Sequence, residues 1–158
     1  MSVRLAVSGA TGRMGHTILD LASKDPQFEI TGALENSSHS AIGKNLSEAL
    51  PSLGADLKVS VHSALSRLNP KPQILIDFTQ PAATLGYLKE ATASGVGLVI
   101  GTTGLSDSEK KQIHEAAKTI PIVMSTNMSV GMNLLFALVE EAAAKLGQDY
   151  DVEILETH

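Results

Sequence analysis

The sequence predicts an α/β fold with a parallel, doubly wound sheet, and three observations point to it. Short apolar segments alternate with segments of helical spacing, which is typical of parallel sheets covered by helices. The first apolar segment ends in a loop with three glycines, and a helical segment follows at once. Glycine, threonine, serine and acidic residues recur where predicted strands end, and the carboxyl ends of parallel strands share one edge of a sheet.

The first predicted strand spans residues 3–8 and runs directly into a loop with Gly9, Gly12 and Gly15. Backbone N–H groups of such a loop lie at the start of a helix, where unpaired donors and the helix dipole favour an anion. One glycine permits the turn, one allows a pyrophosphate close to the backbone, and one lets the helix pack near the strand. The spacing differs from the commoner G-x-G-x-x-G, so the surrounding segments must support this interpretation.

A helix and a second strand are expected after this loop. The helix should end before Pro26, because proline cannot continue the hydrogen-bond ladder. Its apolar face is expected to comprise Met14, Ile18, Leu21 and Ala22. The second strand is predicted at residues 28–34, with Glu35 at its end. The separation of Glu35 from Gly9 is a little longer than the roughly 20 residues usual for the acidic residue that binds a ribose hydroxyl in dinucleotide folds.

The rest of the chain continues the alternation. Residues 36–56 are rich in Ser, Asn and Gly and predict a mobile loop with a short helix at 46–50. Strands are predicted at 57–61, 73–78, 96–100, 121–125 and 150–158, and a helical turn at 62–68. Helices are expected from Pro81 to a stop at Gly95, and after a capping box at Ser106–Glu109 as far as about residue 118. Ser129 should cap a long helix that ends at Gly147, with core positions at Leu134, Leu138, Ala142 and Leu146.

Composition narrows the class of protein. The chain has 158 residues, 43% of them hydrophobic and 18% charged, which suits one domain with a sizeable core. A net charge of −5 argues against nucleic acid or an anionic membrane as partner. Cysteine is absent, which excludes disulfides, thiolate metal sites and thiol nucleophiles, and we expect no metal site. With no secretory signal and no long apolar run, a cytoplasmic location is expected.

Five strand ends are expected to meet at one edge of the sheet: residues 9–15, Glu35, 78–79, 101–104 and 125–128. Ordinary turns between strands and helices are also rich in Gly, Ser and Thr, so one such turn decides little. Five at the same edge favour a ligand site, because ligands of doubly wound sheets bind there. The sequence therefore predicts a dinucleotide-binding protein.

Two classes of dinucleotide enzyme are excluded by missing residues. A short-chain dehydrogenase needs Tyr and Lys four residues apart, but Tyr87 and Tyr150 are followed at that distance by Ala91 and Ile154. A semialdehyde dehydrogenase can share the G-A-T-G turn but needs a cysteine nucleophile, which this sequence lacks.

Five segments carry a resemblance to a known family: Gly9-Ala10-Thr11-Gly12-Arg13-Met14-Gly15, Ile76-Asp77-Phe78-Thr79, Val99-Ile100-Gly101-Thr102-Thr103-Gly104, Asn127-Met128-Ser129-Val130-Gly131 and Glu153-Ile154-Leu155-Glu156-Thr157-His158. In type, order and spacing they resemble the dihydrodipicolinate (4-hydroxy-tetrahydrodipicolinate) reductases of bacterial lysine biosynthesis. The resemblance runs along the whole chain.

This resemblance implies a Rossmann-type dinucleotide-binding domain at residues 1–150, with residues 151–158 starting a substrate and tetramerisation domain that this chain lacks. It implies NAD(P)H-dependent reduction of 4-hydroxy-tetrahydrodipicolinate (dihydrodipicolinate) to tetrahydrodipicolinate on the route to diaminopimelate and lysine. The intact enzyme would be a homotetramer acting on a small dicarboxylate, whereas this piece should bind dinucleotide without turnover. A non-catalytic dinucleotide-binding sensor module stays open as the alternative.

The resemblance also implies roles for individual residues. The pyrophosphate would be held by Gly9, Ala10, Thr11, Gly12, Arg13 and Met14, and the adenosine ribose by Glu35. Other cofactor contacts would come from Phe78, Thr79, Gly101, Thr102, Thr103, Ser125, Thr126, Asn127 and Met128. Thr103 would also lie near the substrate, and His158 would be the catalytic acid–base residue.

Cofactor choice is predicted from two neighbouring residues. Members that accept NADPH often have arginine directly after the acidic residue, whereas Asn36 follows Glu35 here. A carboxylate repels a 2′-phosphate, so NADH is favoured over NADPH, although Arg13 could partly compensate. Asp77 is expected to be structural, with hydrogen bonds to nearby backbone.

Overall fold

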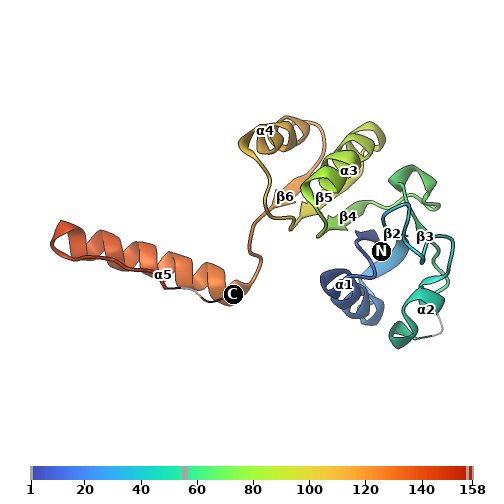
Figure 1. The fold of residues 1–158 in the computed structure, drawn as a ribbon, viewed down its shortest axis with the longest axis horizontal. Helices are drawn as coiled ribbons and strands as arrows, with labels where there is room; N and C mark the ends of the chain where they lie inside the picture. Colours follow the sequence, from blue (N-terminus) through green and yellow to red (C-terminus); the bar gives the residue numbers. More distant parts are fainter. Residues whose placement is uncertain (1, 55–56, 156, 158) are drawn as a thin grey trace. The chain divides into compact units, whose positions relative to one another are not determined.

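The computed structural model describes residues 2–54, 57–155 and 157, and the chain forms two compact units, Met1–Thr126 and Asn127–His158. The first unit contains a sheet with helices on both faces (Figure 1). The second contains α5 (Val130–Leu146) and a short 3-10 turn, η3 (Gly147–Asp149).

Within the described residues, six strands form one sheet in the order β3-β2-β1-β4-β5-β6, and each neighbouring pair is parallel. The strands are β1 (Val3–Ser8), β2 (Phe28–Leu34), β3 (Val61–His62), β4 (Ile74–Asp77), β5 (Gly97–Ile100) and β6 (Ile122–Met124). The chain winds outward in one direction from β1 and in the other from β4. This confirms the predicted parallel, doubly wound sheet.

The helices of the first unit begin and end at residues that local chemistry explains. They are α1 (Arg13–Lys24), α2 (Leu46–Ala49), α3 (Pro81–Ser94) and α4 (Asp107–Ala116), with 3-10 turns η1 (Pro51–Leu53) and η2 (Leu65–Arg67). Pro81 occupies the first turn of α3, and Gly95 ends that helix with a φ of +70°. The Ser106 hydroxyl and Glu109 form the predicted capping box at α4, and the hydrogen bonds from Ser106, its backbone N–H first, lower the pKa of Glu109.

The core lies on both faces of the sheet. One cluster of buried residues joins α3 and α4 to the strands, and a second joins α1 and α2 to the other face (Figure 1). Leu5 and Ala6 are neighbours in β1, yet they belong to different clusters, because successive side chains of a strand point to opposite faces. This double burial explains why the strands are almost wholly apolar in sequence.

The buried face of α1 differs from the predicted one. Gly15, Leu19 and Ala22 are buried, whereas Leu21 is 64% exposed and Met14 is 47% exposed. Gly15 determines this orientation, because its missing Cβ allows α1 to lie against the backbone of the glycine loop. Leu19 follows one turn later on the same face. Of the predicted positions, Ala22 is buried and Ile18 packs against the core, whereas the prediction was wrong for Met14 and Leu21.

The predicted strand at 57–61 overlaps the observed strand only at Val61, because β3 comprises Val61 and His62. The preceding residues pair with another part of the chain: Val59 O accepts from Leu46 N (2.8 Å), and Ser60 forms an isolated antiparallel bridge with Asn45. These hydrogen bonds tie the loop before α2 to residues 57–60, which therefore do not join the parallel sheet.

In the second unit the predicted limits of the long helix are confirmed. The Ser129 hydroxyl accepts from Met132 N (3.4 Å) at the start of α5, and Gly147 ends it with a φ of +71°. The expected core positions Leu134, Leu138, Ala142 and Leu146 are all exposed. The predicted strand at 150–158 is absent from its described residues, 150–155 and 157, and the described part of this unit contains no strand with which they could pair.

Candidate functional site

A cavity of about 620 Å³ lies at the carboxyl ends of the central strands of the first unit. The residues that line it come from the loops after β1, β2 and β4 and from the first two turns of α3: Gly9, Thr11, Gly12, Glu35, Asn36, Phe78, Thr79, Gln80, Ala82, Ala83 and Tyr87. Here β1 lies between β2 and β4, where the strand order reverses. Doubly wound sheets bind ligands at this position.

The glycine loop is shaped by close backbone approaches. Gly9 has a φ of +62°, and a Cβ added there would lie 3.1 Å from Thr79 Cγ2. A Cβ on Gly12 would lie 3.2 Å from Gly9 O, and Gly12 N donates to that same oxygen at 3.0 Å. Gly12 directly precedes α1 and has no side-chain oxygen with which to cap it. The first N–H groups of α1 therefore suit an anion, and this cradle fits a pyrophosphate.

Gly15 brings α1 against this loop. A Cβ on Gly15 would lie 2.8 Å from the Cα of Ala10 and would clash with the carbonyl of Gly9. Arg13 and Met14 form the first turn of α1 and are exposed, whereas Ala10 is buried. The residues predicted to surround the pyrophosphate thus lie together in one turn.

Glu35 lies at the end of β2 and holds the glycine loop. Its Oε1 accepts from Thr11 N at 2.8 Å and from Thr11 Oγ1 at 2.7 Å, and its Oε2 accepts from Asn36 N at 3.3 Å. His39 adds to this group, because its Nδ1 accepts from Ala41 N at 3.2 Å and its Nε2 lies 3.4 Å from Thr11 Oγ1. The sequence predicted a ribose-binding role for Glu35 but not this anchoring role.

Asp77, at the end of β4, is 1% exposed and accepts hydrogen bonds from four hydroxyl groups. The donors lie in β1, in the loop after β4, in α3 and in the loop after β5: Ser8, Thr79, Thr84 and Thr102. The predicted structural role of Asp77 fits its burial, but its partners are side chains rather than backbone.

The loop after β5 packs against the loop after β4. A Cβ on Gly101 would clash with the Phe78 ring, so glycine at this position makes room for the ring. Thr102 is buried and its Oγ1 accepts from Thr79 N at 3.1 Å, whereas Thr103 is exposed. Gly101, Thr102 and Thr103 thus lie at the edge of the sheet beside the cavity lining.

The remaining predicted site residues are more dispersed. Ser125 and Thr126 follow β6, the next strand of the sheet, and Ser125 N donates to Ile100 O at 3.1 Å. Asn127 and Met128 belong to the second unit. The predicted catalytic residue His158 lies outside the described residues.

The lining includes Asn36, which the sequence indicated only for cofactor choice, and four residues that the sequence did not indicate: Gln80, Ala82, Ala83 and Tyr87. A usable signal was the position of Pro81, because a helix that starts directly after β4 must direct its first turns along this edge. Tyr87 is the largest of them. Burial, followed by the negative charges of Asp77, Glu35 and Glu90, raises the pKa of Tyr87 to about 12.

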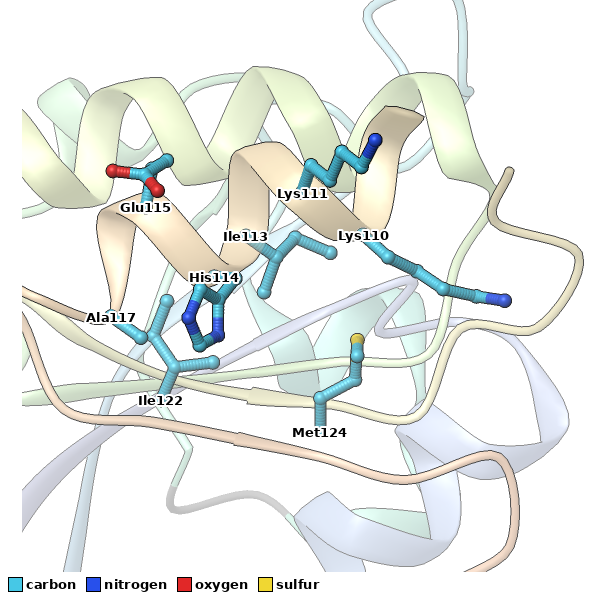
Figure 2. A pocket seen from close by; sticks show the side chains of 8 residues that line it. All are labelled: Lys110, Lys111, Ile113, His114, Glu115, Ala117, Ile122 and Met124. Atoms are coloured by element: carbon cyan, nitrogen blue, oxygen red, sulfur yellow. The ribbon is translucent and has the colours of Figure 1, made fainter. Parts of the chain in front are cut away.

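A second cavity, of about 690 Å³, lies between α4 and β6. Figure 2 shows the side chains of Ile113, His114, Ile122 and Met124 around it, with the amino groups of the two lysines pointing outward. None of the residues predicted for the dinucleotide site lines this cavity.

In the described part of the chain, no helix is long and apolar enough to span a membrane.

Comparison with known proteins agrees with this geometry. The family described as "Dihydrodipicolinate reductase, N-terminus" matches residues 3–128. The 4-hydroxy-tetrahydrodipicolinate reductase of Anaeromyxobacter dehalogenans (strain 2CP-C) is 41% identical over 155 residues, which cover 98% of this chain and 57% of that protein. The same enzyme of Thiobacillus denitrificans is 40% identical over 158 residues, which cover 100% of this chain and 58% of that protein. The chain thus spans somewhat more than half the length of these relatives.

Solved structures show the same relationship. The dipicolinate-bound dihydrodipicolinate reductase from Paenisporosarcina sp. TG-14 superposes with a TM-score of 0.73 at 28% identity, over 91% of this chain and 54% of that one. An aspartate semialdehyde dehydrogenase from Candida albicans gives a TM-score of 0.54 at 20% identity, over 65% of this chain and 30% of that one. The second likeness shows a shared fold alone.

Proposed function

The chain belongs to the dihydrodipicolinate reductase family, matching its N-terminal domain, and we propose that it binds a nicotinamide dinucleotide for the reduction of 4-hydroxy-tetrahydrodipicolinate to tetrahydrodipicolinate. This reaction would supply the diaminopimelate and lysine pathway. The observation that carries the proposal is the cavity at the reversal of strand order, lined by the glycine loop and by Glu35, which is hydrogen-bonded to that loop.

Each part of the site has a proposed task. The N–H groups of the glycine loop hold the pyrophosphate, and Glu35 Oε2 accepts from the adenosine ribose while Oε1 stays bonded to Thr11. Gly101, Thr102 and Thr103 border the nicotinamide ribose, together with Ser125, Thr126, Asn127 and Met128. Thr103 also approaches the substrate, and His158 supplies a proton. When bound, the dinucleotide supplies the hydride.

We further propose that NADH binds more tightly than NADPH. A 2′-phosphate on the adenosine ribose would lie beside the Glu35 carboxylate, and like charges repel. Within the described residues, those that line the cavity include neither lysine nor arginine, so Arg13, in the first turn of α1, offsets this repulsion at most in part.

Calorimetric titration of the 158-residue chain with NADH and with NADPH tests both proposals. We expect NADH to bind with the higher affinity, and tighter binding of NADPH would contradict the argument from Glu35. If neither dinucleotide binds, the site assignment itself is wrong.

The activity needs a separate measurement on the full-length gene product. Steady oxidation of NADH that depends on dihydrodipicolinate is the expected result. Tight NADH binding without such oxidation would contradict the reductase assignment and would favour a sensor module.

A further inference from the structure

We propose that Asp77 and its hydroxyl partners fix the glycine loop after β1 and the loop after β5 relative to each other. Asp77 and Thr84 are then positioning residues for the dinucleotide. This inference rests on the proposed function. The observation behind it is that one buried carboxylate is hydrogen-bonded to Ser8, the last residue of β1 directly before the glycine loop, and to Thr102, in the loop after β5.

The first link joins Asp77 to the pyrophosphate side. Ser8 Oγ donates to Asp77 Oδ1 at 2.6 Å, and the two residues are register partners at the ends of β1 and β4. Ser8 is buried and precedes Gly9, whose positive φ starts the loop. A displacement of the Asp77 carboxylate would therefore be transmitted to the first residue of the glycine loop.

The second link joins Asp77 to the loop after β5. Thr102 Oγ1 accepts from Thr79 N at 3.1 Å, which leaves its own proton to donate to Asp77 Oδ2 at 3.3 Å. Thr79 Oγ1 donates to Asp77 Oδ1 at 2.6 Å. The Thr102 side chain is thus held from two directions, and with it the loop that contains Gly101 and Thr103.

Thr84 connects this network to α3. Its hydroxyl lies within hydrogen-bond distance of both Asp77 Oδ2 and Thr102 Oγ1, the latter at 2.9 Å. Thr84 is 1% exposed and does not line the cavity, although its neighbour Ala83 does. A change at Thr84 can therefore alter dinucleotide binding through the network rather than by loss of a direct contact.

The charge of Asp77 explains why the hydroxyl groups matter. A buried carboxylate loses its hydration, and this loss must be offset by donors within the protein. The hydrogen bonds described for the Asp77 carboxylate all come from serine and threonine hydroxyls, so loss of one leaves a carboxylate oxygen under-solvated. The remaining groups would then rearrange around the carboxylate, which moves the loops that carry them.

The test compares Thr84→Val, which removes the hydroxyl at nearly constant shape, with Thr84→Ser, which restores it. Thr31→Val is the matched control, because Thr31 is buried in β2 and donates to Leu5 O at 3.4 Å, away from the cavity. Each variant is titrated calorimetrically with NADH and with ADP, which keeps the pyrophosphate but lacks the nicotinamide and its ribose. Urea unfolding checks that each variant is folded.

We expect Thr84→Val to bind NADH roughly tenfold more weakly, because loop side chains that lose their fixed positions must be ordered again when the ligand binds. ADP binding should fall less, because the Thr84 hydroxyl contacts Thr102 in the loop after β5, and ADP lacks the ribose that this loop is proposed to border. Thr84→Ser should restore NADH affinity, and Thr31→Val should bind both ligands like the wild type.

Unchanged NADH affinity in folded Thr84→Val would overturn the inference, as would an equal loss for NADH and ADP or an equal loss in Thr31→Val. If Thr84→Val does not fold, Ser8→Ala provides the second test. Ser8→Ala should weaken the binding of both ligands, and wild-type affinity for both would overturn the inference. Failure of the wild-type chain to bind either dinucleotide would instead overturn the proposed function.

Discussion

Glu35 combines two tasks at the end of β2. Its Oε1 is bonded to the backbone and hydroxyl of Thr11, and its Oε2 is proposed to accept from the adenosine ribose. Because one side chain shapes the loop and meets the ligand, the loop is organised before the dinucleotide arrives. Such preorganisation reduces the ordering cost of binding.

Substitution Glu35→Gln tests the ligand half of this role. We expect NADH affinity to fall roughly tenfold, because a charge-assisted hydrogen bond becomes a neutral one. The affinity for NADPH should fall less or should rise, since the repulsion between its 2′-phosphate and the Glu35 carboxylate is removed. Calorimetric titration with both cofactors measures the ratio of the NADH affinity to the NADPH affinity. Glu29→Gln, at an exposed position of the same strand, is the control, and an unchanged NADH-to-NADPH ratio in Glu35→Gln would contradict the prediction.

Tyr87 provides a pH-dependent signal from within the cavity. Its pKa is raised from 10.0 to about 12, chiefly by burial and then by neighbouring carboxylates. The stability that depends on neutral Tyr87 is therefore complete below pH 10 and is lost as the pH rises toward 12. In Tyr150→Phe, Tyr87 is the one remaining tyrosine of the sequence.

Ultraviolet absorbance of tyrosinate in Tyr150→Phe should show a titration midpoint near pH 12. Urea unfolding at several pH values should show stability falling above pH 10 in Tyr150→Phe, and falling less when Tyr87 is also replaced by Phe. A midpoint at the ordinary tyrosine value, or identical pH profiles with and without Tyr87, would show that the environment of Tyr87 differs from the one described.

Among the elements, α1 and α3 contain helical glycines in opposite situations. Gly15 of α1 contacts the glycine loop so closely that a Cβ would lie 2.8 Å from Ala10 Cα. Gly86 of α3 has no atom within 4 Å of an added Cβ apart from its chain neighbours and the adjacent backbone of its own helix. The same substitution at the two positions therefore separates a packing requirement from ordinary helix propensity.

We expect Gly15→Ala to lower the free energy of unfolding by about 1–3 kcal/mol through overpacking, and to weaken NADH binding by moving α1. Gly86→Ala should instead raise the free energy of unfolding by about 0.5–1 kcal/mol, because alanine favours a helix interior. Urea unfolding and calorimetry measure both effects. Equal stability changes of the same sign at the two positions would contradict the packing argument.

At the scale of the whole molecule, the core is concentrated in the first unit. Among the described residues, the buried hydrophobic side chains all lie between Leu5 and Ile120, and α5 contains none. The first unit therefore contains the apolar burial from which most folding stability arises.

A chain that ends after Thr126 should consequently unfold cooperatively, with a Tm within about 4 °C of that of the 158-residue chain, a shift that corresponds to about 1 kcal/mol. Calorimetric heating of both chains makes the comparison. A much lower Tm, or a non-cooperative transition in the shorter chain, would show that residues beyond Thr126 contribute substantially to the core.

The sequence by itself determined the order of elements and most of their limits, because these depend on local chemistry. Pro81 and Gly95 delimit α3, Ser106 and Glu109 begin α4, and apolar runs become strands of a sheet buried on both faces. The three glycines after β1 indicated a helix-start anion site for the same local reason. Motif resemblance predicted the family, and the comparisons confirm it.

Only the tertiary structure decided which side chains meet. The bonds from Thr11 to Glu35, the hydroxyl groups around Asp77, and the place of Tyr87 in the cavity join residues distant in sequence. The buried stripe of α1 was also decided by contact, since Gly15 follows the shape of the loop beneath it. Composition and spacing describe each segment alone, whereas packing and hydrogen bonding depend on which segments the sheet brings together.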